Sequence, residues 1–271
     1  MDVDRISSLA RRQALGDYLT ASVDDGHNLL CSSAHLCRAS IGGDQLIEGQ
    51  LGHVGESYEV RDHGRPLRIL VVGMQVGGSA QNRGGFSHIT LDERTRQIGT
   101  AKPLHATPAP RTPHMVGTEL ALKVLLGLPV ESKGEVNLDS GGRCHVFDMM
   151  SLVNVTLCSR TTGSAKGQGS TVMIDRCARH LAQTIDILQP TVILAQGWRQ
   201  AGRSPSRAVA EVLGIPFPLS HPTVTRAGYH GSLITFIAAT HPTYHWTSTA
   251  MPGWKDLEPK LVDARRVALS N

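Results

Sequence analysis

Short apolar runs alternate with amphipathic stretches along the chain. The apolar runs cover residues 67–72, 145–154, 191–195 and 232–239. Short apolar runs of this length, bounded by glycine or polar turns, are typical of buried strands in parallel sheets. Helical spacing of apolar residues predicts helices over residues 5–21, 119–126, 172–188 and 207–213. Strands alternating with helices indicate an α/β protein with a central, mostly parallel sheet, here of four strands.

Two segments lack this periodicity. Residues 26–64 are polar and glycine-rich, and residues 77–113 are long, polar and rich in proline and glycine. A stretch this long without helical or strand periodicity predicts a functional loop or local disorder, and we expect an insertion over about residues 79–113. Because no linker divides the chain, we expect a single domain over residues 1–271 with its core at about 67–245.

Composition limits the function classes. A chain of 271 residues with 40% hydrophobic residues can bury a substantial core. It has no apolar run of membrane-spanning length and no secretory signal at its start, so we expect a cytoplasmic protein without a membrane partner. The formal net charge of +4 suits a nucleic-acid partner, but a solvated basic surface explains it equally well.

Candidate chemistry lies at the predicted carboxyl ends of three strands, where open α/β sheets bind ligands. The glycines of residues 73–78 allow close backbone approach, and the Gln75 amide can orient a water or meet a base edge. Asn154 offers a donor and an acceptor. His241, followed by Pro242, can donate a hydrogen bond to a carbonyl that gains charge. An ordinary glycine turn and a capping Asn are the alternatives, and His221 is a lower-ranked rival because no predicted strand precedes it.

The order of these segments resembles the iron–sulfur branch of the uracil-DNA glycosylases. That branch carries Gly-Glu-Ala-Pro-Gly after a strand, Gly-Arg-Pro-Phe-Val-Gly, Asn-x-x-x-Cys, a further Cys on a helix, and a strand ending in His-Pro. The corresponding segments here, within residues 67–244, are Gly73-Met74-Gln75-Val76-Gly77, Arg111-Thr112-Pro113-His114-Met115-Val116-Gly117, Asn154-Val155-Thr156-Leu157-Cys158, Cys177 and Ala239-Thr240-His241-Pro242-Thr243-Tyr244.

The resemblance implies a three-layer α/β/α fold and a DNA glycosylase that flips a pyrimidine from DNA and hydrolyses its N-glycosidic bond. In that mechanism His241 stabilises charge on the base and Gln75 positions the water, although Gln75 stands where the family has an acidic motif. Asn154 holds the base edge, and His114 or Phe86 stacks on the base. The other implied substrate-binding residues are Gly73, Met74, Gly77, Gly78 and Tyr244.

Five cysteines occur, and in a cytoplasmic chain they serve as buried small hydrophobes, metal ligands or a catalytic thiol. The resemblance implies that Cys31, Cys37, Cys158 and Cys177 bind a 4Fe–4S cluster. The Cys31-x5-Cys37 spacing departs from the family's Cys-x2-Cys, so free cysteines remain the alternative. Cys144 lies outside the pattern and is expected in the core.

Two substrates fit the resemblance equally. Gly77 stands where the strictest uracil enzymes carry a Tyr against C5, which leaves room for a C5 substituent. The substrate is then either uracil, for repair, or a bulky C5-modified cytosine such as glucosylated hydroxymethylcytosine of phage DNA, for antiviral defence. The expected partner is DNA, bound by a monomer whose phosphate contacts come from Arg160, Lys166 and Arg199. A DNA-binding relative without catalysis is the alternative. A small-molecule hydrolase is disfavoured, because the chain has no G-x-S-x-G motif.

Overall fold

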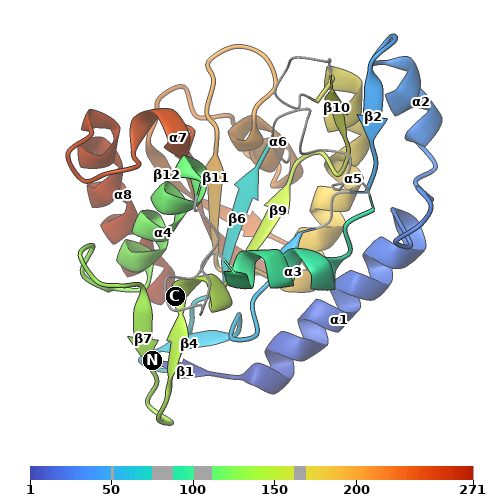
Figure 1. Ribbon diagram of the computed structural model, residues 1–271. Coiled ribbons are helices and arrows are strands. Elements are labelled where there is room, and N and C mark those ends of the chain that lie inside the picture. The colour runs from blue at the N-terminus through green and yellow to red at the C-terminus, as the bar shows by residue number, and fades with distance from the viewer. Residues whose placement is uncertain (50–51, 75–87, 101–111, 162–168, 271) are drawn as a thin grey trace.

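A six-stranded sheet forms the centre of the protein in the computed structural model, which describes residues 1–49, 52–74, 88–100, 112–161 and 169–270 (Figure 1). In spatial order its strands are β12 (Thr223–Tyr229), β13 (Ser232–Ala239), β11 (Val192–Gln196), β6 (Ile69–Gly73), β9 (Met150–Asn154) and β3 (His53–Val54). The four strands from β13 to β9 are mutually parallel, and β12 and β3 flank them in the antiparallel sense. The α/β class is confirmed. The sequence predicted only the four parallel strands of this sheet and missed the two edge strands, β12 and β3.

The apolar pattern of the sequence did not predict β12, because this edge strand alternates only weakly between apolar and polar residues. It pairs with β13 over its whole length, from Thr223 opposite Ala238 to Tyr229 opposite Ser232. The two strands are joined by His230 and Gly231, which have φ of 46° and 78°. Two successive residues with positive φ are the backbone that a tight hairpin needs, and glycine adopts it readily.

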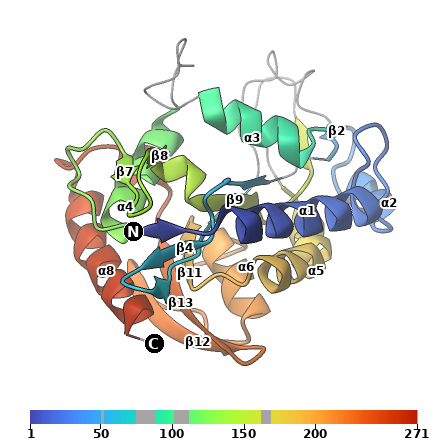
Figure 2. The same cartoon turned by 90° about the horizontal axis from the view of Figure 1, so that it is seen from below.

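Alternate residues of the strands face two apolar cores. Ile69 and Val71 belong to a cluster with α4 (Pro113–Leu125) and α8 (Pro252–Leu269), whereas Leu70 and Val72 pack with α1 (Arg5–Ser22), α5 (Thr171–Leu188) and α6 (Pro205–Val212). Figure 2 shows these two groups of helices on opposite sides of the strands. None of the helices in the described ranges combines the length and apolar composition needed to cross a membrane.

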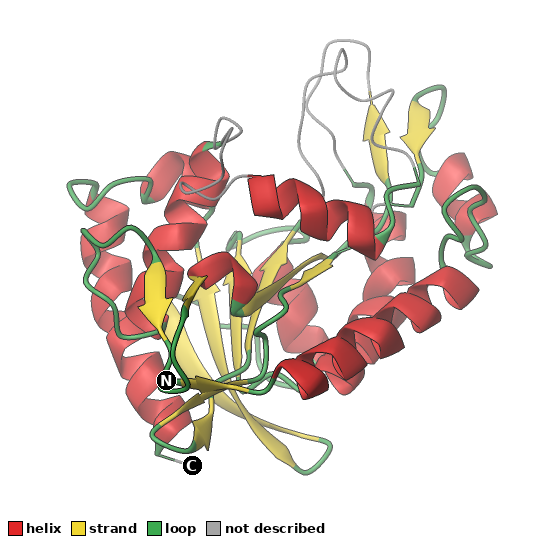
Figure 3. Ribbon diagram, turned by 60° about the horizontal axis from the view of Figure 1, so that its bottom comes forward, coloured by secondary structure: helices red, strands yellow, loops and turns green. Residues whose placement is uncertain are grey.

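The structure corrects three sequence predictions. The predicted insertion contains α3 (Leu91–Thr100), which contacts β3 and crosses in front of the sheet (Figure 3). A strand was predicted from residue 145, but residues Val146–Asp148 form a 3₁₀ helix. The His145 side chain caps this helix by accepting from Phe147 N, so these residues do not pair as a strand. Helix α4 begins six residues before its predicted start, because the Thr112 hydroxyl accepts from Met115 N and Pro113 suits the first turn.

Smaller elements surround this framework. A three-stranded sheet joins β1 (Asp2–Val3), β4 (Val60–Asp62) and β5 (Arg65–Pro66). Strand β2 (Gln45–Ile47) pairs with β10 (Ser159–Thr161), and β7 (Glu135–Asn137) pairs with β8 (Arg143–His145). The remaining helices are α2 (Ala34–Ala39) and the short α7 (Pro242–His245). Segments predicted as irregular over residues 26–64 therefore contain short strands and one helix.

Candidate active site

The carboxyl ends of the parallel strands lie in one row. Gly73 pairs with Asn154 across β6 and β9, and Gln196 pairs with Ala239 across β11 and β13. Between these pairs, Val72 of β6 lies opposite Ala195 of β11. The sequence predicted that segments 73–78, 153–158 and 240–244 converge, and the register brings their described residues to the same edge of the sheet. Gln196 also lies in this row, although it was not among the predicted site residues.

His241 lies two residues beyond the end of β13 and caps the N-terminus of α7. Its Nδ1 accepts a hydrogen bond from Thr243 N at 3.3 Å. A neutral imidazole whose Nδ1 accepts carries its proton on Nε2, so His241 presents an N–H donor. Burial lowers the pKa of His241, and the charges of His245 and Arg199 lower it further. Burial and these cations therefore favour the neutral donor form.

The backbone around His241 is fixed by packing. Trp246 is fully buried, and its indole N–H donates to Thr240 O at 3.1 Å. Helix α4 approaches the same turn at Gly117, where an added Cβ would lie 2.7 Å from Pro242 Cβ and 3.1 Å from Trp246 O. Only glycine leaves room for this approach, so Gly117 and Trp246 together hold the turn that carries His241.

His114, on the first turn of α4, lies beside His241 with ring centroids 5.1 Å apart and the planes tilted by 40°. Burial lowers the pKa of His114 to about 4, and the charges of His241 and Arg94 act in the same direction. The resemblance implied a ring that stacks on the base. The structure places the His114 ring against that of His241, and stacking on a base stays a prediction.

The first predicted motif is described only as far as Met74. Gly73 is buried, and a Cβ added to it would lie 3.0 Å from Oδ1 of Asn154, so the Asn154 amide lies over the Gly73 backbone. The chain beyond β9 continues alongside β6, since Val155 N donates to Gly73 O at 2.8 Å and Thr156 N donates to Met74 O at 3.0 Å. The predicted residues Gln75, Gly77, Gly78 and Phe86 lie outside the described residues.

Two further predicted side chains lie at the same edge. Tyr244 is 61% exposed, and its ring centroid lies 5.9 Å from that of His241. The rival His221 precedes β12, which begins opposite Ala238, so it lies at this edge as well. The ring of His221 contacts that of Trp198 at 4.3 Å between centroids. The sequence argument ranked His221 lower for lack of a preceding strand, but it missed the antiparallel strand that follows.

The four cysteines that the resemblance implies as ligands come from three separate segments, and their thiols affect one another's pKa values. Burial raises the pKa values of Cys158 and Cys177, the latter to about 12, and the charges of the Cys31 and Cys37 thiols raise them further. Cys37 and Cys158 share a small apolar cluster with Met173. By contrast, Cys144 is buried near Asp148, apart from this group.

The surroundings of the four thiols contain several hydrogen-bond donors. Backbone N–H groups of Gly49 and Leu157 donate to Cys158 and Cys177, and Arg179 donates to Cys31 Sγ at 3.4 Å. In the part of the chain that the structure describes, no group of three or more His, Cys, Asp or Glu side chains is arranged to hold a single metal ion. A four-iron cluster spans a wider gap between its thiolates than one ion does, and the donor set is chemically suited to it.

The predicted phosphate contacts differ in their surroundings. Arg160 lies 3.7 Å from the carboxylate of Asp44. Arg199 is exposed just after Gly197 at the sheet edge, and Lys166 lies outside the described residues. A nearby aromatic platform, which the sequence argument missed, has Trp198 stacked on Phe217 with 6.2 Å between centroids and Arg207 over the Phe217 ring at 4.1 Å.

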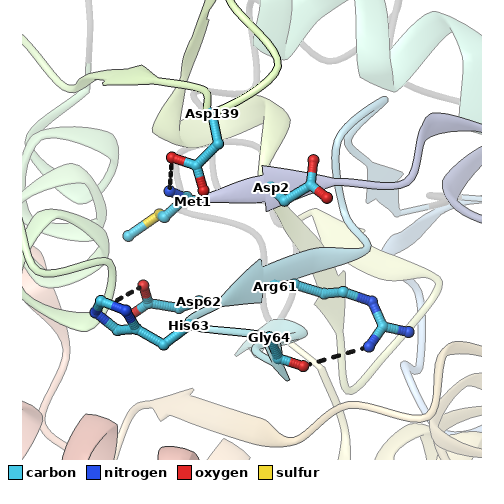
Figure 4. Close-up of a pocket in the computed structure, with 7 residues that line it drawn as sticks. All are labelled: Met1, Asp2, Arg61, Asp62, His63, Gly64 and Asp139. Carbon is cyan, nitrogen blue, oxygen red and sulfur yellow. Dashed lines mark hydrogen bonds and ion pairs between the residues drawn. The ribbon is translucent and has the colours of Figure 1, made fainter.

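A polar pocket on the β1–β4–β5 sheet lies at the opposite end of the parallel strands (Figure 4). Its lining residues pair with one another: Met1 N contacts Asp139 at 3.0 Å, and Arg61 donates to Gly64 O at 3.4 Å. These contacts are structural ties between the hairpins. The pocket shares no residue with the row of strand ends.

Comparison with known proteins does not identify a family. No family model matches the chain, and no curated protein matches it. Function must therefore be argued from the geometry of the site and from the order of the motifs.

Proposed function

We propose that this protein is a DNA glycosylase of the uracil-DNA glycosylase superfamily, in its iron–sulfur branch. It flips a pyrimidine nucleotide out of DNA and hydrolyses the N-glycosidic bond to leave an abasic site. The observation that carries the proposal is the neutral His241, whose Nδ1 accepts from Thr243 N, at the same carboxyl edge of the parallel strands as Asn154. Helices on both faces of the sheet agree with the three-layer fold that the motifs imply.

The chemistry follows from the charge that develops on the base. As the glycosidic bond lengthens, the sugar gains oxocarbenium character and the base becomes anionic. The His241 Nε2–H donates to the base carbonyl, where negative charge accumulates, and so stabilises the transition state more than the ground state. A neutral donor suits this task because its lowered pKa avoids placing a fixed cation in the site before the reaction.

The remaining residues bind and orient. The Asn154 amide lies over Gly73 and is available to the edge of the flipped base, and Met74 lines the same strand end. Tyr244, exposed beside His241, contacts the nucleotide or its neighbour. Gln75 positions the attacking water in this proposal, and Gly77 leaves space at C5. Because Gln75 is an amide, it orients the water without acting as a strong base.

The four thiols fit a 4Fe–4S cluster by their chemistry and by the backbone donors directed at them. Cys31, Cys37, Cys158 and Cys177 would hold it, and the cluster would supply structural cross-linking between α2 with the segment before it, the loop after β9 and helix α5. Cys37 and Cys158 already pack together around Met173. No step of base release depends on the cluster.

Excision from defined oligonucleotides tests the activity. Duplexes and single strands carrying one uracil, one 5-hydroxymethylcytosine or its glucosylated form are incubated with the protein, and alkali then cleaves at abasic sites. We expect cleavage at the modified position with the wild type and not with His241→Ala. DNA retention in a mobility assay without any cleavage, in wild type as well as variant, would favour the binding relative over the enzyme.

A further inference from the structure

The aromatic platform of Trp198, Phe217 and Arg207 lies beside the row of strand ends. Trp198 comes two residues after β11, and His221 comes two residues before β12. Strands β11 and β12 flank β13 on its two sides, and the rings of His221 and Trp198 lie 4.3 Å apart between centroids. These two rings therefore meet beside the end of β13, the strand that leads to His241.

The rings of the platform are held by their neighbours. The Trp198 indole N–H donates to Pro218 O at 3.0 Å, and its ring is stacked on that of Phe217 with the planes only 13° apart. The Arg207 guanidinium lies over the Phe217 ring and donates to Gly202 O at 3.0 Å. Because the Trp198 ring is already fixed, a ligand that stacks on it loses little further entropy to side-chain ordering.

The platform stays accessible from outside the core. Trp198 and Phe217 are half-buried, and His221 is exposed. Leu219, which lies between Phe217 and His221 in the chain, is 87% exposed. The other two tryptophans of the chain are buried in the core. Rings that pack on one another and remain open to solvent are typical of a binding surface.

The charges beside the platform suit an anionic ligand. Arg199, in the loop after β11, is exposed. Arg207 is held by the Phe217 ring and by backbone carbonyls, so its charge is not neutralised by these contacts. The other arginine of this loop, Arg203, pairs with Asp175 and Glu211, both at 2.6 Å, which compensates those two carboxylates. Aromatic rings next to such cations match the π-face and the phosphate of a nucleotide.

We propose that this platform stacks on an unpaired base next to the flipped nucleotide, and that the protein acts on single-stranded DNA. In a duplex, each base is stacked between its neighbours and its faces are closed to a side chain, whereas an unpaired strand exposes them. Arg199 contacts the adjoining phosphate. The inference rests on the proposed glycosylase function and adds the strand state of its substrate.

Tryptophan fluorescence reports on the platform directly. Of the three tryptophans, Trp246 and Trp254 are buried in the core, so quenching by a stacked base comes from Trp198. We expect an oligothymidylate to quench the wild-type emission and to bind about fivefold to a hundredfold more tightly than the same strand annealed to its complement. Equal affinity for the two forms, or binding without quenching, would overturn the inference.

Variants separate stacking from the fold of the loop, with affinity measured by anisotropy of a labelled oligonucleotide. Trp198→Phe keeps a ring but loses the N–H that donates to Pro218, whereas Trp198→Leu loses the ring as well. Trp198→Phe should retain most of the single-strand affinity, and Trp198→Leu should weaken it about fivefold or more. Wild-type affinity in Trp198→Leu, or equal losses in both variants, would show that stacking does not bind the strand.

A matched control lies at the opposite end of β13. His230 stacks on Tyr229 with 4.1 Å between centroids, in the hairpin that joins β12 and β13, and it pairs with Asp186 at 2.8 Å. This pair of rings has a carboxylate where the platform has arginines. His230→Ala should therefore bind single strands as the wild type does, and a loss like that of Trp198→Leu would contradict the assignment of the platform.

Excision distinguishes this inference from the proposed function. The wild type should release a modified base faster from a single strand than from a duplex, and Trp198→Leu should narrow that difference. If release is faster from the duplex, the inference is wrong and the glycosylase function stands. If single strands quench Trp198 but no modified base is released from either form, the stacking platform stands and the proposed function fails.

Discussion

Replacing Gly117 by Ala tests whether packing of α4 fixes the catalytic turn. The added Cβ would lie 2.7 Å from Pro242 Cβ, and ordinary contacts begin at 3.4 Å, so the two elements must separate by about 0.7 Å. In an exposed helix interior, Gly→Ala would stabilise by about 1 kcal/mol. Overpacking of a well-filled site costs about 1–3 kcal/mol, so the net effect should be a loss of up to about 2 kcal/mol.

The effect on catalysis should exceed the effect on stability. A misplacement of about 1 Å can reduce a rate by about a hundredfold, so a shift of the His241 turn should slow base release by about tenfold to a hundredfold. Single-turnover excision and thermal unfolding measure the two effects separately. Gly99→Ala is the matched control, since Gly99 is in helix α3 and its added Cβ meets no atom within 4 Å. If Gly117→Ala is as stable and as fast as wild type, α4 does not hold the turn.

Three further outcomes are expected. His241→Ala should slow base release by about a hundredfold to a thousandfold with DNA affinity retained; single-turnover rates within a few-fold of wild type would move the role to another histidine of this edge. Purified protein should be brown, with iron and absorbance near about 400 nm, and Cys158→Ser should lose both whereas Cys144→Ser keeps them; colourless, iron-free protein after anaerobic purification would contradict this. His114 takes up a proton near pH 6.5 in the unfolded chain but only near pH 4 in the folded protein. The free energy of unfolding should therefore fall as the pH is lowered from about 6.5 to about 4. Denaturant titrations of wild type and His114→Asn check it, and identical pH profiles would contradict it.

Periodicity predicted the parts of the fold whose pattern is local. Strands β6, β11 and β13 were predicted at nearly their observed positions because each is a short, continuous apolar run, and helices α1 and α5 because their apolar residues recur with the helical period. Strand β12 was missed, because an edge strand is specified by its partner and its turn more than by its own alternation.

The candidate site shows the same limit. His241 and Asn154 were found because they lie at or just beyond the ends of strands, and the sheet register brought their neighbours together. Gln196 was missed, since a Gln at the end of an apolar run carries no local signal, and Gly117 was noted only as the last residue of the second motif. The structural roles of both residues come from tertiary contacts, with Thr118 in one case and with Pro242 in the other.

The row of strand ends also has a consequence for how the protein comes to be active. Gly73, Asn154, Gln196 and Ala239 are far apart along the chain and meet only through parallel pairings. Such long-range pairings form slowly, because the intervening chain loses entropy before the contacts reward it. During synthesis, the row cannot be complete until β13 has emerged from the ribosome and inserted beside β11. A chain stalled before residue 232 would hold three of the four positions and still lack His241, so under the proposed function partially made protein should release no base from DNA.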